Sequence, residues 1–200
     1  MDKLLFDHRN LKQILPMFAV AADVFSDEEC QKIIEMEENL NLQKALITNG
    51  VENLDVRNSE ISFIQFSENK KWIFEKLRIA TEYINENYFQ FILDGFDHIQ
   101  YTKYGKKNSH YDWHIDTKYG SGSWEIKRKL SASVFLSDES EYTGGKLEIL
   151  RSSKNKPLGN PRQERGSIVF FPSFLEHRVT KIKSGCRRSL VFWVEGPKFK

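Results

Sequence analysis

The feature that most constrains the fold is the pattern after residue 87, where short apolar runs alternate with turn-forming residues. Runs of roughly four to eight residues rich in Phe, Tyr, Val and Ile are typical of β-strands. A chain with many such strands folds as a β-sandwich or jelly roll. The runs predict strands at Tyr88–Leu93, Phe96–Tyr104, His110–Asp116, Leu130–Leu136, Gly145–Leu150, Ser167–Phe171, His177–Ile182 and Arg187–Val194.

Two amphipathic helices are predicted before this region, with a strand at Glu60–Phe66 between them. A capping box, Ser26-Asp-Glu-Glu29, indicates the start of a helix over residues 27–39. The second helix follows Ser67, and its apolar side chains recur every three or four residues. Those side chains are Ile73, Leu77, Ala80 and Ile84. We therefore predict an α+β fold in one domain, 1–200, with helical support and first strands in 1–95 and a jelly-roll core in 96–200.

Composition excludes several other classes of protein. Thirty basic and twenty-eight acidic residues give a net charge of +2, which provides no strong field to attract nucleic acid. Two cysteines, Cys30 and Cys186, are too few for a disulfide scaffold or a cysteine-rich zinc module. The N-terminal segment does not read as a signal peptide, and no apolar run approaches the roughly 18 residues of a membrane span. We expect a cytoplasmic protein without a membrane partner.

The first chemical motif is His114-Ile-Asp116. Side chains two residues apart on a strand point to the same face, so an imidazole and a carboxylate can bind one metal ion. His177 begins a later predicted strand and is the natural third ligand. Two histidines and one carboxylate leave three positions open, as non-haem Fe(II) oxygenases require. The simpler alternative is that these are ordinary polar residues on the surface. Either motif taken alone would favour that interpretation over a metal site.

A second motif follows ten residues after His177, at Arg187-Arg-Ser189. Strand alternation places Arg187, Ser189 and Trp193 on one face. A guanidinium can hold a carboxylate through two parallel hydrogen bonds, and a nearby hydroxyl can add another. The pattern favours a receptor for a dicarboxylic cosubstrate, although a solvated arginine pair at a strand edge is the simpler interpretation of this motif alone.

Other motifs accompany these residues in a fixed order. They are Phe25-Ser-Asp-Glu-Glu-Cys-Gln-Lys-Ile-Ile34, Tyr101-Thr-Lys-Tyr104-Gly105, Tyr111-Asp-Trp-His114, Gly144-Gly-Lys-Leu-Glu-Ile149, Gly166-Ser-Ile-Val-Phe-Phe-Pro172 and Phe192-Trp193. From about residue 20 to 196, the ordered set resembles the Fe(II)- and 2-oxoglutarate-dependent dioxygenases, within them the prolyl 4-hydroxylase group and its PKHD-type hydroxylases. This resemblance implies a double-stranded β-helix, the cupin-like form of the jelly roll.

The resemblance also implies roles for individual residues. The iron ligands would be His114, Asp116 and His177. Arg187 would bind the distal carboxylate of 2-oxoglutarate with help from Ser189, and Tyr104 would line the same pocket. Tyr111 and Trp193 would lie beside the substrate, where core packing is the competing interpretation. We expect Phe135, Phe170 and Phe192 to provide apolar walls, and loops 117–128 and 151–165 to act as lids.

The resemblance implies hydroxylation of an aliphatic C–H bond at a bound Fe(II). 2-Oxoglutarate and O₂ would be consumed, and succinate and CO₂ would be released. Ascorbate would reduce iron that has become oxidised. A peptidyl prolyl residue is the family's default substrate, and other protein residues or a free amino acid stay open. A non-catalytic jelly-roll binding module is the main alternative. A zinc hydrolase would have no use for Arg187. Nucleic-acid demethylases of this scaffold place a second arginine where this chain has Trp193. Oligomeric state is not predicted.

Overall fold

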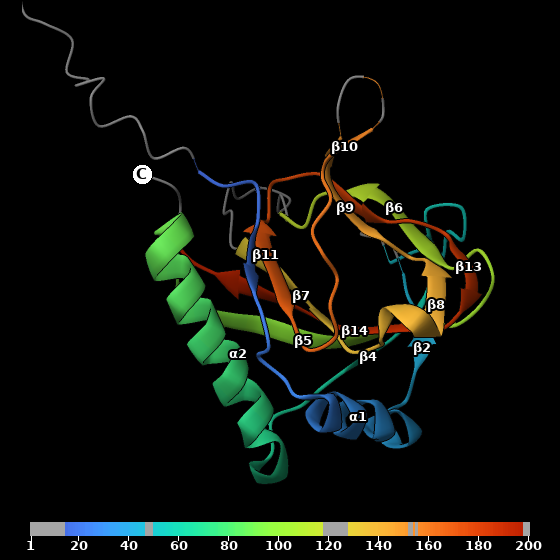
Figure 1. The fold of residues 1–200 in the computed structure, drawn as a ribbon, viewed down its shortest axis with the longest axis horizontal. Coiled ribbons are helices and arrows are strands. Elements are labelled where there is room, and N and C mark those ends of the chain that lie inside the picture. Colours follow the sequence, from blue (N-terminus) through green and yellow to red (C-terminus); the bar gives the residue numbers. More distant parts are fainter. Residues whose placement is uncertain (1–14, 47–49, 118–127, 152–153, 155, 198–200) are drawn as a thin grey trace, which may run out of the picture.

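The structure is a computed structural model that describes residues 15–46, 50–117, 128–151, 154 and 156–197. Two α-helices precede most of the strands (Figure 1). Helix α1 spans Asp27–Glu35 and continues as a 3₁₀ turn over Met36–Asn39. Helix α2 spans Lys71–Ile84, after a 3₁₀ turn over Glu68–Lys70 and before a π-helical turn over Asn85–Phe89. No helix among these residues is long and apolar enough to cross a membrane.

The described strands form two main antiparallel sheets that face each other. The larger, the major sheet, has the order β1-β11-β7-β14-β5-β4-β2, and the minor sheet has the order β10-β9-β12-β6-β3. Major-sheet strands are β1 (Ala19–Ala21), β2 (Gln43–Lys44), β4 (Glu60–Phe63), β5 (Gly95–Tyr104), β7 (Arg128–Phe135), β11 (Ile168–Pro172) and β14 (Arg187–Glu195). Minor-sheet strands are β3 (Arg57–Asn58), β6 (His110–His114), β9 (Leu147–Arg151), β10 (Pro157–Gly159) and β12 (His177–Val179).

A third pair, β8 (Tyr142–Gly144) with β13 (Ile182–Gly185), forms a separate two-stranded sheet, and a 3₁₀ turn over Glu139–Glu141 precedes β8. Two facing sheets with supporting helices make the double-stranded β-helix that the sequence predicts, so the α+β fold class is confirmed. The assignment of residues 1–200 to one domain stays a prediction.

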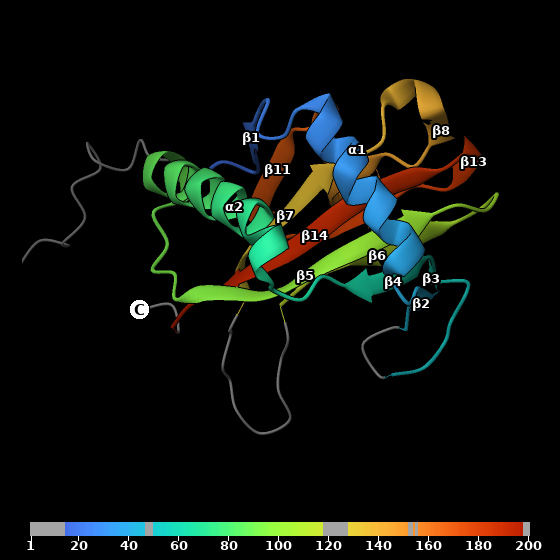
Figure 2. The ribbon, with the colours of Figure 1, turned by 90° about the horizontal axis from the view of Figure 1, so that it is seen from below.

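Both predicted helices form for the reasons that their sequences indicate. The Ser26 hydroxyl accepts the Glu29 backbone N–H, and the Glu29 carboxylate accepts the Ser26 N–H at 2.8 Å. The predicted stripe of α2 is buried along its whole length. Figure 2 shows α1 and α2 on the same side of β11, β7, β14 and β5. The helices therefore cover one face of the major sheet, which we call the helix face.

The major sheet has two chemically different faces because side chains alternate along its strands. On the helix face, the central strands place apolar side chains against the helices, namely Ile99, Tyr101, Leu130, Val134, Ile168, Phe170, Leu190 and Phe192. The opposite face, the cavity face, looks toward the minor sheet and is largely polar. Its buried residues include Gln100, Thr102, Tyr104, Ser131, Ser133, Arg187 and Ser189.

Several sequence-based expectations of structure were wrong. Tyr88–Leu93 is not a strand, because the Asn85 side chain bonds both backbone groups of Phe91 and closes a turn. The run His177–Ile182 is divided between β12 and β13. Phe170 and Phe192 pack in the helix-face core and are not walls of the site. The short strands β1, β2, β3, β8 and β10 were not predicted.

Candidate metal and cosubstrate site

The three predicted metal ligands lie together between the sheets. His114 ends β6 and His177 begins β12, and the two are directly paired in the antiparallel ladder. Asp116 follows β6, and its carboxylate oxygens lie 3.7 Å from His114 Nε2 and 3.3 Å from His177 Nε2. One candidate ligand atom from each residue lies within 4.8 Å of the others. The strand pairing therefore brings residues 63 positions apart in sequence to one point.

Hydrogen bonds fix which nitrogen each histidine presents. His114 Nδ1 lies 2.7 Å from the Asp112 carbonyl oxygen, and His177 Nδ1 lies 3.0 Å from that of Leu175. A carbonyl only accepts, so both Nδ1 atoms donate, and both Nε2 atoms face Asp116. This is the outer-sphere arrangement that metal-binding histidines commonly have.

The carboxylate of Asp116 is anchored from the major sheet. Ser131 on β7 donates its hydroxyl proton to Asp116 Oδ2 at 2.8 Å, and the Ser131 and Ser173 hydroxyls are hydrogen-bonded to each other. The Asp116 backbone N–H donates to the Ser173 carbonyl at 3.0 Å. These bonds hold the carboxylate beside the two imidazoles before any ion binds.

The protonation of the three groups suits a cation. Burial and, to a smaller extent, the neighbouring His177 lower the pKa of His114 to about 3, so this imidazole is neutral. Burial opposes ionisation of Asp116, yet the two histidines hold its pKa below the ordinary range. Burial also opposes charge on His177, but Asp116 raises the pKa of His177. A bound cation would thus replace a proton shared between Asp116 and His177.

Arg187 is the largest fully buried side chain of this region and has an incomplete set of partners. It begins β14 opposite Tyr104 of β5, and its Nη1 donates to the Ser189 hydroxyl at 3.0 Å. Its Nε and Nη2 are buried and have no hydrogen-bond partner among the described residues. Burying a guanidinium with unmatched donors is costly, and these two donors have the charge and geometry to bind a carboxylate.

The surroundings of Arg187 are aromatic and tightly fitted. Its guanidinium lies 5.4 Å from the Tyr104 ring centroid and 5.3 Å from that of Phe135, and the role of Phe135 as an apolar wall stays a prediction. Gly145 has a positive φ, and a Cβ there would lie 3.1 Å from the Arg187 Cδ. Gly145 therefore leaves room for the arginine stem.

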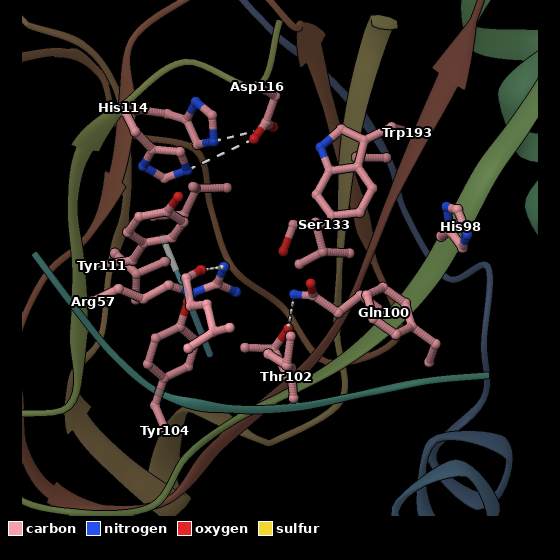
Figure 3. A pocket seen from close by; sticks show the side chains of 18 of the residues that line it. Arg57, His98, Gln100, Thr102, Tyr104, Tyr111, His114, Asp116, Ser133 and Trp193 are labelled. Atoms are coloured by element: carbon pink, nitrogen blue, oxygen red, sulfur yellow. Dashed lines mark hydrogen bonds and ion pairs between the residues drawn. The ribbon is translucent and has the colours of Figure 1, made fainter. Parts of the chain in front are cut away.

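The metal triad and Arg187 share one cavity of about 1270 Å³ between the two sheets. Tyr111 lines it and stacks on His114 with ring centroids 3.5 Å apart. Figure 3 shows Trp193 across the cavity from His114, with its indole nitrogen turned toward Asp116. All the predicted site residues except Ser189 line the cavity. Ser189 is hydrogen-bonded to Arg187, which lines it.

Some residues of the cavity were missed by the sequence interpretation. Arg57 of β3 is buried with its guanidinium carbon 4.4 Å from the Tyr111 ring centroid. Gln100 donates to the Thr102 hydroxyl at 2.8 Å, and both line the cavity face of β5 upstream of Tyr104. The alternation that grouped Arg187 with Ser189 could have identified Gln100 and Thr102, whereas nothing local marked Arg57.

The structure describes only part of the two predicted lid loops. Residues 118–127, which make up most of the loop 117–128, lie outside the described residues. The loop 151–165 contains strand β10, which pairs with β9. A lid function for either loop stays a prediction.

Comparison with known sequences gives consistent similarities. A family model described as the 2OG-Fe(II) oxygenase superfamily matches residues 99–195. A PKHD-type hydroxylase of Prochlorococcus marinus is 31% identical over 184 residues, which cover 82% of this chain and 76% of that protein. A PKHD-type hydroxylase of Nitrosomonas europaea is 27% identical over 187 residues, which cover 90% of this chain and 78% of that protein.

Solved structures share the fold at low sequence identity. A prolyl-4-hydroxylase of Pseudomonas putida superposes with a TM-score of 0.69 at 17% identity, covering 91% of this chain and 94% of that one. A Trichoplax adhaerens prolyl hydroxylase, in complex with a hypoxia-inducible-factor peptide fragment, gives a TM-score of 0.72 at 15% identity. That match covers 90% of this chain and 83% of the other.

Proposed function

The chain belongs to the 2OG-Fe(II) oxygenase superfamily, among its PKHD-type hydroxylases, and we propose that it hydroxylates an aliphatic C–H bond of a peptidyl prolyl or other amino-acid residue. It is a 2-oxoglutarate-dependent dioxygenase of the prolyl hydroxylase-like kind. When bound, Fe(II), 2-oxoglutarate and O₂ supply the oxidation, in which one oxygen atom enters the substrate and the other enters succinate as CO₂ is released.

The observation that carries this proposal is the pair of unsatisfied donors on Arg187. Its Nε and Nη2 are buried without a partner in the described part of the chain. Ser189 adds a hydroxyl at 3.0 Å, and Tyr104 and Phe135 keep water away from the guanidinium. The distal carboxylate of 2-oxoglutarate fits these donors in charge and geometry. A zinc hydrolase or a plain binding module would leave the buried cation unexplained.

The metal-binding role that we propose follows from the donor set. His114 and His177 turn their Nε2 atoms toward the site, and Asp116 presents a carboxylate held by Ser131. Nitrogen and oxygen ligands on one side of an ion suit Fe(II) and leave positions for a cosubstrate and O₂. Tyr111 fixes the plane of the His114 ring by stacking against it.

The substrate would lie between the metal site and Trp193. Tyr111 and Trp193 form two walls of the cavity, and Phe63 and Leu46 line its exposed end at 43% and 48% exposure. A cavity of about 1270 Å³ exceeds the 300–1,000 Å³ typical of drug-sized ligands. This favours a polypeptide segment over a free amino acid. Ascorbate would serve to restore oxidised iron.

The proposal can be tested by anaerobic titration of the purified chain with Fe(II) and 2-oxoglutarate. We expect a visible charge-transfer band in the wild type and none in His114→Ala. His110 is a matched control, because it lies on the same strand but bonds the Asn108 and Asp55 carbonyls and does not line the cavity. His110→Gln should keep the band. A folded, iron-loaded wild type without the band would refute the proposal.

The substrate class is tested by measuring succinate release with peptide and free amino-acid libraries under the same conditions. We expect release above the substrate-free rate with prolyl-containing peptides. Release only with free amino acids would refute the polypeptide assignment and leave the oxygenase assignment in place.

A further inference from the structure

Two similar stacks of an acid, an arginine and a tryptophan occur in the described part of the molecule, one at the cavity and one away from it. At the cavity, Arg128 donates from Nε and Nη2 to Asp97 Oδ2 at 2.9 and 2.5 Å. Its guanidinium carbon lies 3.8 Å from the Trp193 ring centroid. Away from the cavity, Arg178 bonds Glu148 at 2.6 Å and lies 4.7 Å from the Trp113 ring centroid.

In the stack at the cavity, the ion pair is largely buried, and the neighbouring His98 reaches the surface. The side chains of Arg128 and Asp97 are 11% and 12% exposed, so their ion pair is shielded from water. Asp97 also accepts from His98, whose exposed ring packs edge-on against Phe63. Burial opposes ionisation of Asp97, but Arg128 and His98 hold its pKa below the ordinary value. The carboxylate therefore stays charged and keeps hold of Arg128.

Trp193 depends on this stack because its side chain has no hydrogen-bond partner in the part of the chain that the structure describes. It lies on β14, opposite Ser131 of β7, and is 7% exposed. Its indole N–H is buried and makes no hydrogen bond with the described residues. A flat guanidinium over an indole favours one ring orientation. The indole edge then stays beside the metal ligand (Figure 3).

We propose that Asp97 and Arg128 are positioning residues that fix Trp193 as the wall of the substrate site beside Asp116. This inference rests on the proposed function, because the wall matters only if a substrate is oxidised there. Asp97 takes two donors of Arg128, so the guanidinium cannot turn toward water, and the stacked ring cannot turn away from the metal site. Loss of Asp97 leaves the metal triad and Arg187 in place but loosens the wall that holds the substrate.

The first test measures the tryptophan side chains directly. The chain has four tryptophans, so its ¹⁵N-labelled spectrum contains four indole N–H signals, and Trp193→Phe and Trp113→Phe assign two of them. Asp97→Asn should shift or broaden the Trp193 signal and leave the Trp113 signal unchanged. Glu148→Gln, the matched control, should affect Trp113 alone. Arg128→Lys should reproduce the Asp97→Asn effect, because an ammonium keeps the charge but cannot stack as a plane.

The second test separates positioning from a general loss of structure. Using the peptide found by succinate release, we expect Asp97→Asn to raise its KM about tenfold, as loss of one cation–π-supported contact implies. The ratio of succinate to hydroxylated peptide should rise, whereas 2-oxoglutarate affinity should not change. Glu148→Gln should leave all three values unchanged.

The outcomes distinguish this inference from the proposed function. An unchanged Trp193 signal in both Asp97→Asn and Arg128→Lys would overturn it, as would equal losses of peptide and 2-oxoglutarate binding. A shifted Trp193 signal in a chain whose wild type never consumes 2-oxoglutarate would support the positioning and refute the proposed function. If Asp97→Asn does not fold, Arg128→Lys alone decides.

Discussion

Arg187 and Arg188 are adjacent on β14, yet strand alternation places them on opposite faces of the major sheet. On the helix face, Arg188 donates to Glu37 at 2.8 Å, and Glu37 also accepts from Tyr101 and Lys103. On the cavity face, Arg187 contacts a serine hydroxyl and leaves two buried donors unmatched in the described structure. Arg188 completes an ion cluster, whereas Arg187 keeps two donors that a ligand can bind.

The difference teaches that the two faces serve different purposes. The helix face combines an apolar core with a satisfied charge cluster, which stabilises the fold. The cavity face keeps a buried cation with two donors unmatched among the described residues, which by itself costs stability. Such a cost is typical of a surface that is preorganised for a ligand. Substitutions on each face should therefore change one property and spare the other.

The largest expected effect is that of Arg187→Met. Removing the guanidinium should weaken 2-oxoglutarate binding about 100-fold or more, because a buried charged contact is worth about 3 kcal/mol. The free energy of unfolding should stay the same or rise by about 1 kcal/mol, since an unpaired buried charge is lost. Isothermal titration with 2-oxoglutarate and urea unfolding measure the two quantities.

Arg188→Met provides the control for that experiment. It should lower the free energy of unfolding by about 2 kcal/mol because Glu37 loses a partner, and it should keep 2-oxoglutarate affinity. Equal effects of the two substitutions on ligand affinity would contradict the division between faces.

A smaller effect is expected from Glu37→Gln, and it depends on pH. Burial opposes ionisation, but bonds from Lys103, Arg188 and Tyr101 lower the pKa of Glu37 from 4.5 to about 2. The ionised carboxylate therefore stabilises the fold above about pH 4.5, and this contribution disappears as the pH falls toward 2. Allowing for partial contact with water, we expect Glu37→Gln to cost about 2 kcal/mol at pH 7.

The measurement is urea unfolding of wild type and Glu37→Gln at intervals between pH 7 and pH 3. The difference between the two proteins should shrink as the pH falls. A difference that is constant over this range would show that Glu37 acts through packing rather than through its charge.

The sequence grouped several residues that the structure brings together, because these residues follow short, local rules. His114 and Asp116 share a face through i, i+2 spacing, and Arg187 and Ser189 do the same on β14. The stripe of α2 is set by its helical period, and all four predicted residues are buried. The distant partner His177 was chosen because it begins a later predicted strand, and the ordered motifs of the family that the chain resembles supported that choice.

The contacts that sequence could not predict depend on three-dimensional packing between distant segments. Glu37 bonds residues 64 to 151 positions away, and Arg128 meets Asp97 across 31 positions. No periodicity marks such pairs. The wrong prediction of a strand at Tyr88–Leu93 has a different cause. A short apolar run is compatible with several structures, and hydrogen bonds from the Asn85 side chain to the Phe91 backbone form a turn there.

The smallest expected effect is that of Ser131→Ala on the cavity face of β7. The Ser131 hydroxyl donates to Asp116 Oδ2 at 2.8 Å, so its loss frees the carboxylate to turn without removing a ligand. Loss of such an outer-sphere bond weakens metal binding about 10- to 100-fold, and we expect the lower end because the Asp116 backbone stays bonded to Ser173. Competition with a metal-binding dye measures this affinity. Leu130→Val, one residue away on the helix face, should reduce stability by about 1 kcal/mol and leave metal affinity unchanged. If Leu130→Val weakened metal binding as much as Ser131→Ala, the two faces of the sheet would not be independent.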